Sequence, residues 1–267
     1  SQGADIVAVT AQTPAGIEKF EAQWLVGADG GRSTVRKVMG VGFEGYTWPE
    51  RFLVASTHYD YEPHGFQLNT YVADPVDWNA MFKMPGDGPP GLWRVLFPIA
   101  PEEDEAAALS EANIERLMQG FQPKAGRYSI QYKSIYKVHQ RVASDFRVGR
   151  ALLAGDAAHL NNPIGAFGLN GGIHDAINLA GKLGRVCRGE ADDRLLDLYV
   201  RQRRTVNLEY VQEFSIKNLQ RLTARTEEER RRNFDELRRA ASTVEGARNF
   251  LLVSSMIASV QRAEAIF

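Results

Sequence analysis

The stretch from Ala151 to Gly189 constrains the fold of this chain more than any other. It opens on the uninterrupted apolar run Ala151–Ala154, which is typical of a strand buried on both faces in an α/β sheet. A glycine-rich loop follows, and apolar residues then recur at helical spacing from Leu169 to Leu183, with Gly189 placed to end the helix. This order of strand, loop and helix aims backbone N–H groups and a positive helix end at an anion, although glycine-rich loops also occur as plain turns.

A second segment near the amino end has a related pattern. The apolar strand Trp24–Val26 is followed by a turn with glycines on both sides of Asp29. Arg32 and Arg36 lie four residues apart, and they share one face if a helix begins at Ser33. On these residues alone, a ligand site and a Ser-capped helix after a hairpin-like turn are both open interpretations.

Composition excludes several classes of protein. The 267 residues carry 32 basic and 33 acidic side chains, a net charge of −1, which argues against a nucleic-acid partner. Cys187 is the one cysteine, so an internal disulfide and a cysteine-built metal site are excluded. A reducing cytoplasm is the expected location, and a secreted protein without disulfides is the alternative. The most apolar stretch, Phe250–Val260, is shorter than the roughly 20 residues of a membrane span, so no membrane partner is expected. We interpret it as a carboxy-terminal helix that belongs to the core or to a subunit interface, and a homodimer is one alternative.

The rest of the chain divides into zones. Residues 46–142 are rich in aromatic residues, proline and glycine, and the segments 51–61, 66–72 and 91–100 are predicted strands of one sheet. Within this zone Ser110 is placed to cap a helix over 111–121. From residue 191 onward the pattern is helical, and the charged run Glu227–Arg232 is predicted to be a solvated helix face.

Taken together, the segments GADGGRSTVR and ALLAGDAAHLNNPIGAFGLNGGIHDAINLAGKL resemble the flavin-dependent aromatic hydroxylases. These are the single-component FAD monooxygenases of the para-hydroxybenzoate hydroxylase type. The first segment is similar to the Asp-Gly motif of that family, which touches FAD and the nicotinamide dinucleotide. The second is similar to the Gly-Asp motif, which holds the FAD ribose and pyrophosphate and wraps the isoalloxazine ring. The resemblance covers residues 1 to about 225.

The resemblance implies a mixed α/β and α+β fold with three parts. A Rossmann-like FAD- and NAD(P)-binding domain, incomplete at its amino end, takes residues 1–45 and 143–190; an inserted β-sheet substrate domain takes 46–142; and a helical region takes 191–267. No G-x-G-x-x-G loop stands between an opening strand and a helix at the start of the sequence, where this fold has it, and the sequence also begins without Met. We therefore expect the chain to be a fragment without the first βαβ unit, where the AMP half of FAD would sit, and to bind FAD weakly or not at all as it stands.

The resemblance also implies a set of cofactor-binding residues. Asp156 suits a ribose hydroxyl, the N–H groups of Ala157 and Ala158 would face pyrophosphate, and the helix start near Leu169 would face the N1–C2 carbonyl region of the flavin. No catalytic side chain is identified, because the flavin supplies the oxygen chemistry. The cofactor-binding set is Asp29, Gly30, Arg32, Gly155, Asp156, Ala157, Pro163, Gly165, Gly168, Leu169 and Asn170.

The activity that the resemblance implies is hydroxylation of a small aromatic, phenol-like substrate through a flavin hydroperoxide, with FAD as cofactor, NADH or NADPH as co-substrate, and O2. The substrate candidates on the predicted sheet are Tyr71, Trp78, Trp93 and Arg94, although aromatic residues in strands are more often core. Two alternatives stay open. One is a different reaction of the same flavoprotein group, such as epoxidation, halogenation or decarboxylating hydroxylation, and the other is a truncated, non-catalytic module.

Other arrangements of polar residues carry weaker hypotheses. Asp156 with His159, and His174 with Asp175, suggest a metal site or a hydrolytic dyad, but no third ligand has suitable spacing and no G-x-S-x-G elbow exists. We therefore expect no metal. Arg203 with its neighbour Arg204 either lies on the surface or braces the sheet.

Overall fold

The computed structural model describes all residues, 1–267, and they form two compact units. Unit 1 comprises Ser1–Tyr46, His139–Ser215 and Arg248–Phe267, and unit 2 comprises Thr47–Val138 and Ile216–Ala247. None of the helices combines the length and the apolar character that crossing a membrane requires.

Unit 1 contains a hairpin and a small sheet with a parallel pair. The sheet has the order β3-β10-β9, in which β3 and β10 are parallel and Leu25 lies opposite Ala151. The apolar run after residue 150 is therefore a strand, as predicted. The strands are β1 (Val7–Thr13), β2 (Gly16–Ala22), β3 (Leu25–Gly27), β9 (Arg147–Val148), β10 (Ala151–Leu153) and β11 (His159–Leu160), with the start of β4 (Phe43–Thr57) and the end of β8 (Ile130–Ala143).

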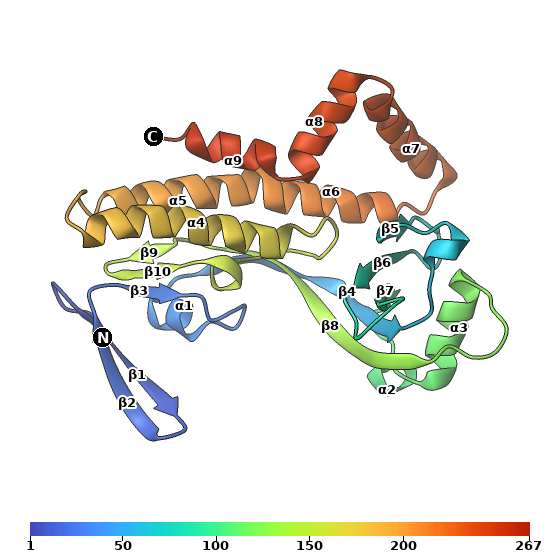
Figure 1. Cartoon of the computed structure of the whole chain (residues 1–267), viewed down its shortest axis with the longest axis horizontal. Coiled ribbons are helices and arrows are strands. Elements are labelled where there is room, and N and C mark those ends of the chain that lie inside the picture. Colours follow the sequence, from blue (N-terminus) through green and yellow to red (C-terminus); the bar gives the residue numbers. More distant parts are fainter. The chain divides into compact units, whose positions relative to one another are not determined.

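Helices α4 and α5 lie side by side along the layer of β9 and β10 (Figure 1). Leu179 of α4 and Tyr199 of α5 are buried in one cluster with Leu153, and the Tyr199 hydroxyl donates to the Leu153 carbonyl at 2.6 Å. The helices of this unit are α1 (Thr34–Val38), α4 (Phe167–Cys187), α5 (Leu195–Val206) and α9 (Ile257–Glu264), with a 3-10 turn at Gly155–Ala157, a π-helical turn at Asn207–Gln212, the start of α6 (Glu213–Leu222) and the end of α8 (Val244–Ser254).

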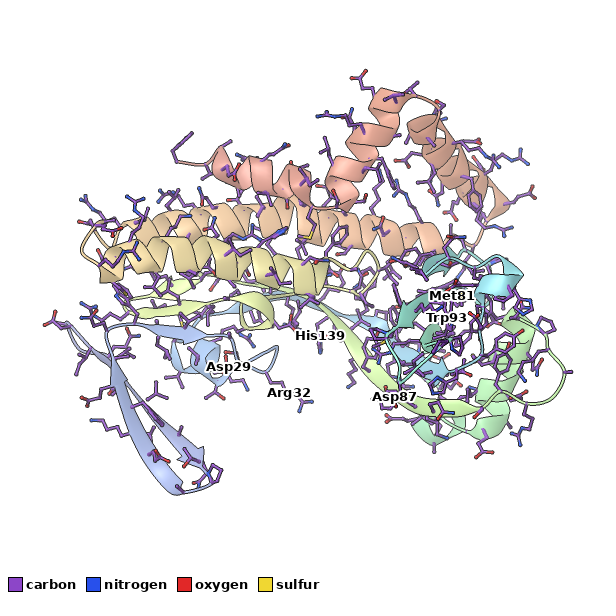
Figure 2. All side chains as sticks on the ribbon, viewed as in Figure 1. Asp29, Arg32, Met81, Asp87, Trp93 and His139 are labelled. Carbon is purple, nitrogen blue, oxygen red and sulfur yellow. The ribbon has the colours of Figure 1, made fainter.

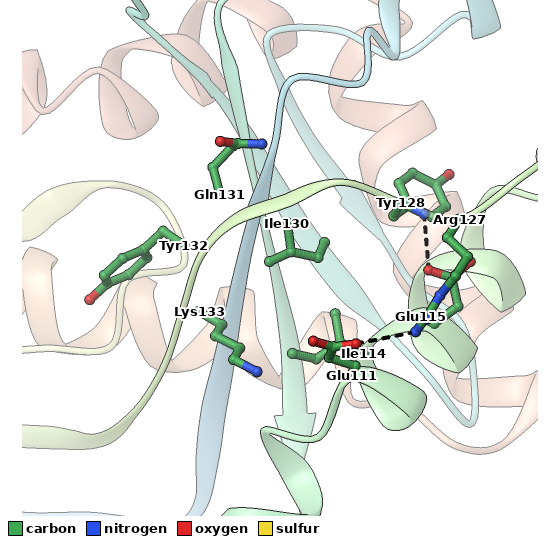
Figure 3. Close-up of a pocket in the computed structure, with 9 residues that line it drawn as sticks. All are labelled: Glu111, Ile114, Glu115, Arg127, Tyr128, Ile130, Gln131, Tyr132 and Lys133. Carbon is green, nitrogen blue, oxygen red and sulfur yellow. Dashed lines mark hydrogen bonds and ion pairs between the residues drawn. The ribbon is translucent and has the colours of Figure 1, made fainter.

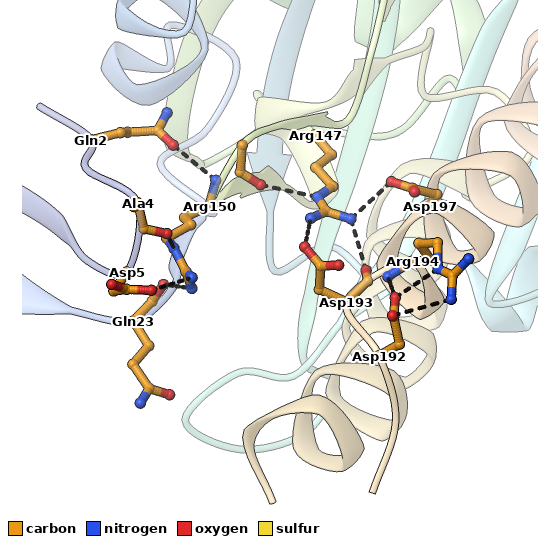
Figure 4. Close-up of polar contacts among 11 residues, drawn as sticks. Gln2, Ala4, Asp5, Gln23, Arg147, Arg150, Asp192, Asp193, Arg194 and Asp197 are labelled. Carbon is orange, nitrogen blue, oxygen red and sulfur yellow. Dashed lines mark hydrogen bonds and ion pairs between the residues drawn. The ribbon is translucent and has the colours of Figure 1, made fainter. Parts of the chain in front are cut away.

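Two arginines fasten the amino-terminal segment and α5 to the small sheet (Figure 4). Arg150 donates to the carbonyls of Ala4 at 2.6 Å and Gln23 at 3.2 Å. Arg147 forms ion pairs with Asp193 at 2.6 Å and Asp197 at 2.8 Å. Because these pairs are partly exposed, they fix geometry more than they add stability.

Unit 2 is built on an antiparallel sheet with the order β8-β4-β7-β6-β5. The predicted strand over 91–100 and the predicted helix over 111–121 are confirmed, and Ser110 caps that helix by accepting from the Asn113 N–H at 3.2 Å. The predicted strands over 51–61 and 66–72 are confirmed only as far as Thr57 and from Asn69 onward. The 3-10 turn at Glu62–His64 also lies here. The other elements are β5 (Asn69–Val72), β6 (Asn79–Met84), β7 (Leu92–Ile99), α2 (Glu105–Ala108), α3 (Glu111–Phe121) and α7 (Glu227–Ala241), with the remaining parts of β4, β8, α6 and α8.

Strand alternation divides the unit 2 sheet into two faces. Trp93 and Met81, both labelled in Figure 2, are fully buried on the face that α3 covers. There Trp93 meets the ring of Tyr61 edge-on at 5.3 Å between centroids. Arg94, the next residue along β7, points to the opposite face. The charged helix α7 has no buried residue, as expected for a solvated face.

The expectation of one continuous helix over Phe250–Val260 is wrong. Helix α8 ends at Ser254, and α9 begins after Met256, whose φ of +63° is left-handed. The Ser255 hydroxyl donates back to the Leu251 carbonyl at 2.6 Å, a local bond that competes with helix continuation. Met256 is buried against Phe167, so side-chain burial sustains the break.

Candidate functional site

The turn after β3 is organised around Asp29. Its carboxylate accepts hydrogen bonds from the Ser33 hydroxyl at 2.5 Å and from the N–H groups of Thr34 at 2.7 Å and Val35 at 3.1 Å. Partial burial acts to raise the pKa of Asp29, but these hydrogen bonds outweigh it and hold that pKa below its ordinary value. Ser33 also caps α1, so the structure contains the Ser-capped helix, and Asp29 supports its first turn.

The expectation that Arg32 and Arg36 share one helix face is wrong, because Arg32 precedes the N-cap residue Ser33. Arg32 is exposed, directed away from the ribbon and without a hydrogen bond to the protein (Figure 2). Arg36 is buried. The two guanidinium groups therefore have different roles: Arg32 is available to an external anion, and Arg36 is part of the scaffold.

Arg36 ties the first motif to the second. Its guanidinium donates to the Ala157 carbonyl at 2.7 Å and to the Gly31 carbonyl at 2.8 Å, and it lies 3.6 Å from the centre of the Phe43 ring. Burial lowers the pKa of Arg36, and the nearby Asp29 opposes that shift. One side chain thus sets the distance between segments more than 120 residues apart.

The turn after β10 presents a single carboxylate. Gly155 has a left-handed φ of +60°. Its α-carbon packs closely against Gly172 of α4, since a Cβ added to Gly172 would lie 3.3 Å from the Gly155 α-carbon. Asp156 is exposed and makes no hydrogen bond or ion pair within the chain. The expectation that the Ala158 N–H faces a pyrophosphate is wrong, because this group donates to the Gly155 carbonyl at 2.8 Å. Ala157 is fully buried, so any contact that it makes with a ligand is through its backbone.

Helix α4 begins without a side-chain cap. Its N-cap residue, Ala166, has a φ of +57°, an uncommon conformation for a residue with a Cβ. The loop before it is held by Gln140, whose side-chain oxygen accepts from both nitrogens of Asn162 at 3.1 Å. At the helix start Leu169 and Asn170 are exposed. Strain together with uncapped N–H groups at a helix start is typical of an anion-binding position.

The remaining loop residues of the predicted set lie in the same turn. Pro163 accepts the Ala166 N–H at 3.0 Å, Gly165 has a φ of +112°, and Gly168 packs toward Asn161.

These features fit the cofactor that the sequence predicted. Strands β3 and β10 are parallel, so both motifs leave the sheet at its carboxyl edge, where ligands bind in open α/β sheets. The unpaired carboxylate at Asp156 suits a ribose hydroxyl, and the uncapped start of α4 suits an electron-rich carbonyl region.

A buried polar network lies beneath the Gly155 turn, and sequence reasoning missed it as part of the site. Asp175 of α4 accepts from the Gly155 N–H at 3.0 Å, from His159 Nε2 at 2.7 Å and from Arg203 Nε at 2.7 Å. The open alternatives for Arg203 and Arg204 were a surface position or a brace of the sheet: Arg203 is buried and braces helix α4, whereas Arg204 donates to the Ala143 carbonyl of β8 at 3.0 Å. Asp175 is four residues from both Gly171 and Leu179, which are also buried, and that spacing is the signal that could have found it.

The predicted substrate residues do not share one environment. Register places Arg94 opposite Ser56, and Tyr71 opposite Ala80, on one face of the unit 2 sheet. Trp78 packs edge-on against Phe52 at 5.4 Å. Trp93 lies on the other face, inside the core.

Unit 2 also has a surface hollow of about 520 Å³ beside α3 (Figure 3). Its charged side chains already have partners within the chain: Arg127 lies 3.6 Å from Glu111, and the Glu115 carboxylate accepts the Tyr128 N–H at 3.0 Å. It shares no residue with either motif. The lining residues are Glu111, Ile114, Glu115, Arg127, Tyr128, Ile130, Gln131, Tyr132 and Lys133.

Comparison with known proteins agrees with this geometry. Residues 2–214 match the model of the FAD binding domain family. The para-nitrophenol 4-monooxygenase of Pseudomonas sp. (strain WBC-3) is 40% identical over 212 residues, and the 6-hydroxy-3-succinoylpyridine 3-monooxygenase of Pseudomonas putida is 35% identical over 205 residues. Each alignment covers 76% of this chain and 50% of the relative, so the chain spans about half the length of these relatives.

A solved structure shows the same fold. The crystal structure of p-nitrophenol 4-monooxygenase from Pseudomonas putida DLL-E4 superposes with a TM-score of 0.88 at 34% identity, covering 98% of this chain and 65% of the other. The family match, together with the two motifs at one sheet edge, confirms the predicted fold class and FAD as the cofactor of the family. The chain belongs to the FAD-binding domain family of the flavin-dependent aromatic hydroxylases.

Proposed function

We propose that this chain binds FAD at the edge where β3 and β10 end, and that it is part of a monooxygenase that hydroxylates a phenol-like ring with NADH or NADPH and O2. The observation that carries the proposal is the convergence of the two motifs, tied by Arg36, in a chain of the FAD-binding family. When bound, FAD supplies the redox and oxygen chemistry. The chain's own residues bind it, orient it and shield it from water.

In this proposal each motif has a separate task. Asp156 accepts a hydrogen bond from a ribose hydroxyl, and exposed Arg32 faces a phosphate of FAD or of the nicotinamide dinucleotide. The uncapped start of α4 directs N–H groups at the electron-rich edge of the ring system, where negative charge develops on reduction. Residues 1–45 and 143–190 form the cofactor part.

Residues 46–142 form the substrate part of the proposal. Arg94 and Ser56 lie opposite each other, and each has a buried polar atom, Nε and Oγ, without a hydrogen-bond partner. The Tyr136 ring packs edge-on against Phe52 at 5.8 Å between centroids, and Phe52 shares its face of β4 with Ser56, so this phenol lies on the Arg94 side of the sheet. Burial raises the pKa of Tyr136, and Arg94 opposes that shift. We infer that Arg94 and Ser56 hold a polar substituent of the aromatic ring, with Tyr71 on the same face. Because Trp93 faces the opposite side, the proposal does not use it.

The cofactor part is tested by titrating FAD with the purified chain and following flavin fluorescence, with NADH or NADPH oxidation in the presence of 4-nitrophenol as the second measurement. Quenching with a saturable curve supports the cofactor site. Stimulation of NAD(P)H oxidation by the phenol supports the activity. Unquenched emission with this chain, and also with a longer protein that includes the first βαβ unit, contradicts the proposal. We also propose that the protein is a homodimer and that it is located in the cytoplasm. The single free cysteine supports this location, because it suits a reducing compartment.

Replacing Asp156 by Asn is expected to weaken FAD binding by about 1.5–3 kcal/mol, or about 10- to 150-fold in Kd, because a charged hydrogen bond to the ribose is lost. The measurement is the same fluorescence titration. Asp5→Asn is the matched control, since this exposed carboxylate only reaches Arg150 at 3.6 Å. Equal affinities of the two variants would remove Asp156 from the site.

A further inference from the structure

Asp175 is a carboxylate buried away from solvent at the centre of unit 1. Its side chain is 0% exposed, as is that of His159, and that of Arg203 is 3% exposed. Three donors from three different elements converge on it: the Gly155 backbone, the His159 ring and the Arg203 guanidinium. The side chains of Asp175, His159 and Arg203 are buried, so the network meets the predicted cofactor-binding residues only at the backbone of Gly155.

The charge state of the network follows from its contacts. Burial acts to raise the pKa of Asp175, but His159 and Arg203 outweigh it, so that pKa lies below its ordinary value. An ionised carboxylate only accepts hydrogen bonds, so His159 Nε2 carries a proton and donates. The His159 Nδ1 atom is buried without a partner. The Asp175 carboxylate therefore accepts all three hydrogen bonds, from Gly155, His159 and Arg203, and it fixes the positions of these three donors.

The groups that Asp175 holds are those that shape the turn. Gly155 directs its N–H inward to Asp175, and the next residue, Asp156, is exposed at the surface. His159 stands at the far end of the same turn and packs on α4: a Cβ on Gly171 would lie 3.4 Å from the ring. Both ends of the five-residue segment from Gly155 to His159 are thus fastened to one carboxylate.

Stability alone does not account for this arrangement. The desolvation of a buried ion pair offsets most of its attraction, and well-packed apolar residues often serve as well. A backbone N–H that must point inward, however, needs an acceptor at that place. Arg203 adds a second link, because its Nη2 donates to the Gly171 carbonyl at 3.3 Å.

We propose that Asp175 is a positioning residue of the flavin site, which holds Gly155 and His159 so that Asp156 faces the FAD ribose. The inference rests on the proposed FAD binding and adds a residue that neither touches the cofactor nor takes part in its chemistry. It predicts that the effect of Asp175 on FAD affinity passes through Asp156.

The experiment is a double-mutant cycle on the FAD dissociation constant, with wild type, Asp175→Asn, Asp156→Asn and the double variant. Asn keeps the size of Asp175 but places an NH2 group against the donors of the network. Asp175→Asn is expected to raise the Kd by about tenfold or more. The double variant is expected to bind within about twofold of Asp156→Asn, because the two effects are not additive when one residue acts through the other. Effects that multiply, or an unchanged Kd in Asp175→Asn, would overturn the proposal.

A structural measurement without cofactor accompanies the cycle. Hydrogen exchange of the apo protein is expected to show lost protection at Gly155–His159 in Asp175→Asn, with the β1–β2 hairpin unchanged. Asp197→Asn is the matched control, since it removes another arginine-paired carboxylate of unit 1, 2.8 Å from Arg147, and is expected to leave both the Kd and the exchange unaltered.

If Asp175→Asn does not yield folded protein, His159→Leu takes its place in the cycle. This change removes one donor and leaves the pair of Asp175 with Arg203 intact. A raised Kd in His159→Leu that is not additive with Asp156→Asn then supports the proposal, and an unchanged Kd or effects that multiply would overturn it. Failure of the wild type to bind FAD would contradict the proposed function, whereas tight binding by Asp175→Asn and His159→Leu together with weak binding by Asp156→Asn would contradict only the role of Asp175.

Discussion

Gly45→Ala is expected to destabilise unit 1 by about 2–5 kcal/mol, combining the strain of a side chain at positive φ with the cost of forced backbone shifts. Gly45 has a φ of +122°, and a Cβ there would overlap with the carbonyl oxygen of Gln140 and lie 3.0 Å from the Arg141 α-carbon. The obstacle is backbone, so no side-chain rotation relieves it. The measurement is urea denaturation of the apo chain followed by circular dichroism.

The matched control is Gly16→Ala in the β1–β2 hairpin. Gly16 has nearly the same φ, +123°, but nothing lies within 4 Å of the added Cβ. This variant is expected to lose only about 1 kcal/mol, from backbone strain alone. Equal losses in the two variants would show that the strand contact at Gln140 can open without cost.

Gly45→Ala also bears on the cofactor site. Gln140 accepts hydrogen bonds from Asn162 and donates to the Ser215 hydroxyl at 2.9 Å, so a displaced Gln140 releases the loop before α4. We expect weaker FAD binding in Gly45→Ala and unchanged binding in Gly16→Ala. This difference separates loss of the loop from general loss of stability.

The elements that carry the site could be predicted because their patterns are local. An apolar run after Arg150, a glycine-rich loop and a helical period predicted β10 and α4, and Ser110 predicted the start of α3. The helical spacing of the apolar residues did not show which face of α4 is buried. Leu169 and Ile177, two of the residues that define it, are 78% and 68% exposed, whereas Asp175 is buried. A helical period locates a helix, but burial depends on what packs against it.

The residues that organise the site could not be predicted, because their partners are remote in the sequence. Arg36 bonds to Ala157, and Arg203 to Asp175, across 121 and 28 positions. In a sequence, an arginine beside other charged residues is typical of a solvated surface. Burial of such a side chain depends on acceptors that only the folded chain brings together. Strand β6 was not predicted because its apolar residues are consecutive and few, and β8 was not predicted because polar residues interrupt its alternation.

Arg36→Met is expected to destabilise the apo chain by about 3–5 kcal/mol and to weaken FAD binding. Met keeps much of the apolar contact with Phe43 but removes two charge-assisted hydrogen bonds, each of which contributes about 1.5–3 kcal/mol. The Ala157 and Gly31 carbonyls then lose their donor. Relief from burying the guanidinium charge offsets part of the loss, so the sum of the two bonds is an upper bound. Urea denaturation and hydrogen exchange at Gly155–Leu160 measure the effect.

Two further variants separate charge from geometry. Arg36→Lys keeps the positive charge, but one ammonium cannot reproduce the fork that spans both carbonyls, so an intermediate loss is expected. Arg32→Met removes an exposed arginine of the same turn and is expected to leave the apo stability within about 0.5 kcal/mol, while FAD binding weakens. If Arg36→Lys matched the wild type in both measurements, charge alone would join the motifs. If Arg36→Met matched Arg32→Met in stability, the bridge to Ala157 would have no part in holding the two turns together.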